Sequence, residues 1–124
     1  MKKIVNQINT FISKQLWLDF FFETINENIV KIIGTKDTSY NEENCIEIIF
    51  ENVSHIKTIL YDWTKDEENL FIQIENASRC EDIFGFKMDK TSTLFSIAAS
   101  CHSKRPIWIV SKSIKFNLLK LNQS

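Results

Sequence analysis

Apolar and polar residues alternate along most of the chain after position 19, and this alternation constrains the fold more than any other feature. In the run CIEIIFEN (45–52), Ile46, Ile48 and Phe50 share one side and the glutamates share the other. Successive side chains of a strand point to opposite faces, so this run predicts a strand with one buried face. The same rhythm predicts strands in the runs DFFFETI (19–25), IVKIIGT (29–35), IKTILYDW (56–63), LFIQIEN (70–76), IFGFKM (83–88), TLFSIAASC (93–101), PIWIVSKS (106–113) and IKFNLLKL (114–121).

The N-terminal residues follow a different period. Apolar side chains recur there at intervals of three and four, which predicts an amphipathic helix over about residues 3–17. The apolar face of this helix would carry Ile4, Ile8, Phe11, Ile12 and Leu16.

No second strong helical pattern lies between the predicted strands, which argues against parallel βαβ winding. We therefore expect an α+β, mostly β fold: an antiparallel sandwich or partly closed barrel of about eight or nine strands with one N-terminal helix. The 124 residues predict a single domain, 1–124, with a β-rich body over about 19–121. Gly85 is expected at a bulge or sharp bend, and Pro106 at the first residue of a strand.

The sequence predicts a cytoplasmic protein that does not cross a membrane. Polar residues from Asn6 to Thr10 interrupt what would be the apolar part of a signal peptide, and no apolar run approaches membrane-spanning length. Cys45, Cys80 and Cys101 are odd in number and widely spaced, which is typical of reduced thiols. We expect Cys45 and Cys101 to act as small hydrophobic side chains.

Cys101 and His102 form the one adjacent pair of a thiol and an imidazole. If both lie in a strand, their side chains point to opposite faces and cannot act as nucleophile and base. If His102 enters the following turn, contact is possible but unordered. The histidines and cysteines lack the spacing of a structural zinc site. We predict no catalytic residues, no metal and no cofactor.

Other chemistries have little support in the sequence. The acidic clusters at 42–43 and 66–68 lie in predicted turns, where acidic side chains are usually solvated. Two glycines cannot make a phosphate-binding loop. The basic C-terminal segment carries aromatic residues, as nucleic-acid-binding grooves do, but its alternation is that of a strand with one solvated face, and the net charge is −1. We expect neither enzymatic activity nor nucleic-acid binding.

Charge is spread unevenly. Residues 37–82 hold twelve acidic and three basic residues, whereas residues 83–124 hold seven basic and one acidic. Such a split indicates either an acidic face for a basic partner, or acidic strands that pair with basic strands so that the charges cancel across the sheet. Aromatic side chains among the acidic residues would make good interface anchors. The candidate partner-binding surface comprises Tyr40, Glu42, Glu43, Tyr61, Trp63, Asp66, Glu67 and Glu68.

The order of three segments, DFFFETINENIVKI (19–32), CIEIIFENVSHIKTI (45–59) and PIWIVSKSIKF (106–116), resembles that of small bacterial immunity proteins from toxin–immunity systems. The resemblance covers about residues 19–118 and is one of strand rhythm. It implies a β-rich domain that binds and blocks a cognate toxin, and it transfers no functional residue.

The leading hypothesis is a non-enzymatic cytoplasmic protein that binds a protein partner, most specifically an immunity protein that covers a basic toxin with the acidic, aromatic surface. One alternative is a small-ligand-binding β-barrel or sandwich, with or without weak enzymatic activity. Another is a homo-oligomeric structural module that associates through an exposed strand edge.

Overall fold

The structure is a computed structural model that describes residues 1–26, 28–36, 44–58, 62–66, 69–99 and 106–119. Within these ranges the elements follow the order α1 (Lys2–Ser13), β1 (Asp19–Ile25), β2 (Ile29–Thr35), β3 (Asn44–Lys57), β4 (Trp63–Thr64), β5 (Ile72–Glu75), α2 (Arg79–Phe84), β6 (Thr93–Ile97) and β7 (Ile107–Leu118). The predicted α+β, mostly β fold with an N-terminal helix is confirmed. No helix in the described ranges is long and apolar enough to cross a membrane.

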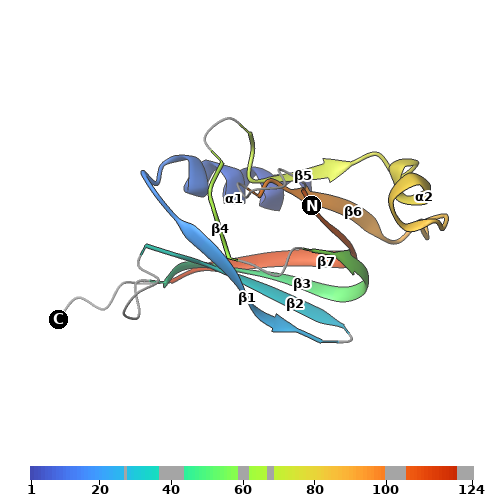
Figure 1. Cartoon of the computed structure of the whole chain (residues 1–124), viewed down its shortest axis with the longest axis horizontal. Coiled ribbons are helices and arrows are strands. Elements are labelled where there is room, and N and C mark those ends of the chain that lie inside the picture. Colours follow the sequence, from blue (N-terminus) through green and yellow to red (C-terminus); the bar gives the residue numbers. More distant parts are fainter. Residues whose placement is uncertain (27, 37–43, 59–61, 67–68, 100–105, 120–124) are drawn as a thin grey trace.

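The strands form one antiparallel sheet in the order β4-β1-β2-β3-β7-β6-β5, and the sheet curls into a half-barrel (Figure 1). Of the two predicted architectures, the partly closed barrel is the one observed. The described part of the chain has seven strands, fewer than predicted. The two runs at 106–113 and 114–121 join into the single long strand β7, and β3 continues through an irregularity after Val53 to Lys57.

Within the described ranges, one helix was not predicted from the sequence, and it lies in the region 79–88. The predicted strand at 83–88 is wrong, because Arg79–Phe84 forms α2 and Gly85 ends it in the left-handed conformation (φ 81°). Gly85 is therefore a helix C-cap and not a strand bulge. Pro106 lies just before the first residue of β7, close to its predicted place.

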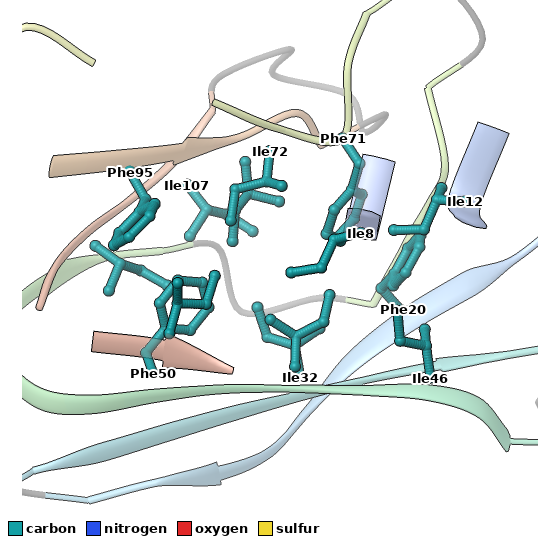
Figure 2. Packing of buried hydrophobic residues seen from close by; sticks show 14 of the residues in the cluster. Ile8, Ile12, Phe20, Ile32, Ile46, Phe50, Phe71, Ile72, Phe95 and Ile107 are labelled. Atoms are coloured by element: carbon teal, nitrogen blue, oxygen red, sulfur yellow. The ribbon is translucent and has the colours of Figure 1, made fainter. Parts of the chain in front are cut away.

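The main core lies between α1 and the concave face of the sheet (Figure 2). Val5, Ile8 and Ile12 of α1 point into it. The predicted alternation of β3 is confirmed there, because Ile46, Ile48 and Phe50 are fully buried. The other members, which fill the half-barrel, include Phe20, Val30, Ile32, Phe71, Ile72, Phe95, Ile97, Ile107 and Ile109.

Two large apolar residues of predicted elements, Leu16 and Leu70, are exposed. The helix ends at Ser13, short of residue 17, so Leu16 lies beyond it and is 97% exposed. Leu70 begins the run 70–76 that was predicted to be a strand, but it precedes β5 and is also exposed.

A buried amide attaches α1 to the edge of the sheet at β5. Asn9 donates from Nδ2 to the carbonyl of Ile72 (2.8 Å) and accepts at Oδ1 from the N–H of Ile72 (3.0 Å). These two bonds satisfy backbone groups of β5 that face away from β6. The side chain of Asn9 thus takes the place of a neighbouring strand at an edge that would otherwise be open.

The charged side chains of the outer face are paired across strands. Lys31 lies 3.5 Å from both Glu23 and Glu47, and Lys115 lies 3.5 Å from Glu51. The Glu47 carboxylate is the stronger cause of a raised pKa at Lys31. Acidic β3 therefore lies beside basic β7, so the expectation that charges cancel across the sheet is confirmed for these strands.

A smaller cluster covers the opposite face of β6 and β7. Its buried members are Cys80 of α2, Leu94 and Val110. Nearby, the ring of His55 stacks on that of Phe86 with 4.0 Å between centroids. The contacts of Cys80 fix α2 against the sheet, and this explains why six residues remain helical.

Candidate functional site

The predicted acidic, aromatic surface falls largely outside the described residues. Six of its eight members are outside the described ranges: Tyr40, Glu42, Glu43, Tyr61, Glu67 and Glu68. Of the other two, Asp66 is half-buried, and its Oδ2 accepts a hydrogen bond from Asn69 (3.0 Å).

Trp63 was predicted to belong to that surface, but it is buried. Its side chain is 2% exposed, and its ring lies 5.7 Å from that of Phe20 and 5.2 Å from that of Phe22. The short strand β4 pairs with the start of β1 and turns Trp63 into the core. A residue in this position cannot anchor a partner at the surface. Its indole N–H has no hydrogen-bond partner among the described residues.

The cysteines do not form a site in the described part of the chain. Cys101 and His102 lie outside it. Cys45 is buried in the main core, as expected of a small hydrophobic side chain, and Cys80 is buried in the smaller cluster on the opposite face. No group of histidine, cysteine and acidic side chains within the described ranges is arranged to hold a metal ion.

A groove of about 710 Å³ lies on the described surface between α1 and the end of β7. We call it the α1–β7 groove. One wall is the solvent-facing side of α1. The other wall is the apolar face of β7 near the end of the strand. Its lining residues are Lys3, Asn6, Gln7, Thr10, Phe11, Lys14, Phe116 and Leu118.

The groove lies where the apolar face of β7 becomes more exposed toward the end of the strand. Ile114, Phe116 and Leu118 share one face of β7, as their alternation predicts. Ile114 is buried, Phe116 is half-buried against the core and Leu118 is 54% exposed, so burial falls steadily toward the end of the strand. Phe11 closes the floor from the helix side, where it packs against the edge of the core.

The charge of the groove is entirely positive. Lys3 and Lys14 are its only ionisable lining residues, and α1 contains no acidic residue. Eleven residues at 1.5 Å each place these lysines about 16 Å apart along the helix axis, on the same side. Within the described ranges, no hydrogen bond or ion pair occupies the side chain of either lysine.

A second cavity of about 300 Å³ lies near the end of α1 and contains several polar side chains. Its polar groups already have partners within the chain. Lys65 donates to the carbonyls of Ile12 (3.3 Å) and Gln15 at the helix C-terminus, and Asn9 bonds to Ile72. These contacts hold α1 in place, which is a structural role.

The α1–β7 groove was not predicted from the sequence, because only the apolar face of the helix entered the prediction. One signal was present: the segment carries lysines near both ends and no acidic residue. Comparison of the chain with protein-family models, with curated proteins and with solved structures gives no match.

Proposed function

We propose that this chain is a non-enzymatic binding protein that contacts a protein partner through the α1–β7 groove. The observation that carries the proposal is the composition of the groove: an apolar floor, a positive rim and amide side chains, all on the surface. Phe11, Phe116 and Leu118 supply apolar contact area, and the lysines supply charge to orient the partner.

The most specific form of the proposal is an immunity protein that blocks a cognate toxin. The resemblance of segment order to immunity proteins supports it, and a cytoplasmic location would suit the role. Occlusion needs only a rigid surface of adequate area, and the filled half-barrel provides such a support. The acidic residues at 42–43 and 66–68 remain a predicted second contact region, for a different part of the partner.

The small-ligand alternative fits the structure less well. It requires an apolar pocket, usually inside the barrel. Phe20, Phe50 and Phe95 fill the described interior together with the isoleucines around them (Figure 2). A ligand would therefore have to bind at the surface, where the α1–β7 groove offers volume and apolar area.

Titration calorimetry against the purified product of the neighbouring gene tests the proposal. The variant K3E/K14E reverses both charges of the groove, and K87E/K90E reverses two exposed lysines near α2 as a matched control. We expect K3E/K14E to bind at least about tenfold more weakly, because complementary rim charges turn into repulsive ones. Unchanged affinity in K3E/K14E, or an equal loss in both variants, would rule out the groove as the contact surface.

A further inference from the structure

We propose that the α1–β7 groove binds an extended, acidic segment of the partner protein, with apolar side chains at alternate positions and carboxylates near both ends. This inference rests on the proposed function, because it concerns the same groove and adds the chemistry of the segment that binds there.

The two walls of the groove differ in kind. On the helix wall, residues three and four apart form a single row along α1, which runs from Lys3 through Asn6, Gln7 and Thr10 to Lys14. The wall formed by β7 is apolar and presents Phe116 and Leu118. A ligand in this groove therefore meets polar groups along one side and apolar groups along the other.

The spacing of charges on the helix wall favours a peptide over a small amphiphile. The two ammonium groups belong to residues about 16 Å apart along the axis, and five residues of extended chain at about 3.3 Å each cover the same length. A fatty-acid carboxylate could neutralise one lysine and would leave the other unused. A peptide with acidic residues near both ends can neutralise both.

The groups between the lysines favour an extended backbone. Asn6 and Gln7 each offer a donor and an acceptor, and Thr10 offers a hydroxyl; all three side chains are exposed and have no hydrogen-bond partner within the described ranges. An extended segment has unpaired N–H and C=O groups that these side chains can satisfy, whereas a bound helix would already have paired its own.

The apolar wall favours alternation. Phe116 and Leu118 are two positions apart in β7, so their side chains emerge on the same face one strand repeat apart. Apolar side chains at alternate positions of an extended ligand have the same repeat and can contact both. The groove thus selects a segment with apolar residues at i and i+2, flanked by acidic residues.

Two-dimensional NMR of the full-length chain tests the inference. The probe is the capped peptide Glu-Glu-Leu-Thr-Leu-Glu-Glu, and the control is Gln-Gln-Leu-Thr-Leu-Gln-Gln. We expect the acidic peptide to shift amide signals of α1 and of the end of β7, and to bind about tenfold more tightly than the control. The same loss of about tenfold is expected in K3Q/K14Q, whereas K87Q/K90Q should bind as the wild type does.

Three results would overturn the inference: equal binding of the two peptides, tighter binding of decanoate than of the acidic peptide, or concentration-dependent self-association that K3Q/K14Q abolishes. The last two would assign the groove to a small amphiphile or to a second copy of the chain. If K3E/K14E loses the partner but the acidic peptide does not bind, the inference fails and the proposed function stands. If K3E/K14E keeps the partner, the proposed function itself fails.

Discussion

At the scale of the residue, Gly34 shows how closely the inner face of the sheet is packed. A Cβ at this position would lie 2.8 Å from Cγ2 of Ile46 and 2.8 Å from Cε1 of Phe20. These residues are its partners on the two neighbouring strands, and both are fully buried. Glycine at position 34 is therefore required by space, and not by backbone conformation.

Gly34→Ala should lower the free energy of unfolding by about 1–3 kcal/mol, because neither neighbour can move away without disturbing the core. Urea denaturation measures the change. The control is Gly85→Asn, at a left-handed position with open space around it, which asparagine tolerates at a cost below about 1 kcal/mol. A Gly34→Ala protein as stable as the wild type would show that the strands are packed less tightly than described.

Cys80 carries a prediction on pH. Burial raises the pKa of its thiol, and the negative charge of Glu81 adds to the effect. A thiol with a raised pKa in the folded state favours folding below the pKa of the unfolded thiol, about 8.5, and this contribution is lost as the pH rises through the folded pKa. The unfolding free energy of the wild type should fall more steeply from pH 8 to pH 10 than that of Cys80→Ala. Parallel curves would contradict the burial of this thiol.

Trp63 shows why the residues of a binding surface were hard to predict from the sequence. A tryptophan beside acidic residues fits an interface anchor by composition, yet the pairing of β4 with β1 directs Trp63 into the core. That pairing joins residues more than forty positions apart in the chain, at Phe20 and Trp63. The local sequence does not indicate a contact between such distant residues. The burial of Trp63 could therefore not be predicted from it.

At the scale of the element, the described side-chain hydrogen bonds between α1 and β5 come from one residue, Asn9. Asn9 is 8% exposed and satisfies both backbone groups of Ile72 at the sheet edge. Asn9→Ala should lower the free energy of unfolding by about 1–3 kcal/mol, because the N–H of Ile72 loses its partner in a buried place. Hydrogen exchange should show lost protection at that amide.

The matched control is Asn6→Ala, which removes an exposed amide from the same helix and should change stability by less than about 0.5 kcal/mol. Equal effects of the two substitutions would mean that Asn9 does not cap the edge of β5.

The two helices show what local pattern can and cannot predict. The spacing of Ile8 and Ile12 predicted α1 and its buried face, because a helix twelve residues long repeats its pattern several times. The six residues of α2 complete fewer than two turns, and their helical state depends on Cys80 packing against β6 and β7. Period-2 alternation in the overlapping run IFGFKM then favoured a strand.

At the scale of the whole molecule, one core joins nearly every element. Residues of α1 and of the strands from β1 to β7 belong to the same buried cluster. The order of strands, with β3 beside β7, comes from pairings between distant segments and could not be read from alternation alone. The sequence predicted the class of fold and offered the cancellation of charge as one of two alternatives, whereas the α1–β7 groove depends on the packing of segments far apart in the chain.

A shared core predicts cooperative unfolding, because no element can leave without exposing the apolar side of its neighbours. Thermal transitions followed by far-ultraviolet circular dichroism and by tryptophan fluorescence should coincide. Two separate midpoints would show that α1 or α2 unfolds independently of the sheet.

Hydrogen exchange of the chain, alone and in complex with the product of the neighbouring gene, reports whether α1 and the end of β7 form the surface that meets a partner. We predict new protection at amides of residues 3–14 and 116–118, with little change at α2 and on the outer face of β3. Protection confined to α2 or to the outer face of β3, with α1 unchanged, would contradict the proposed function.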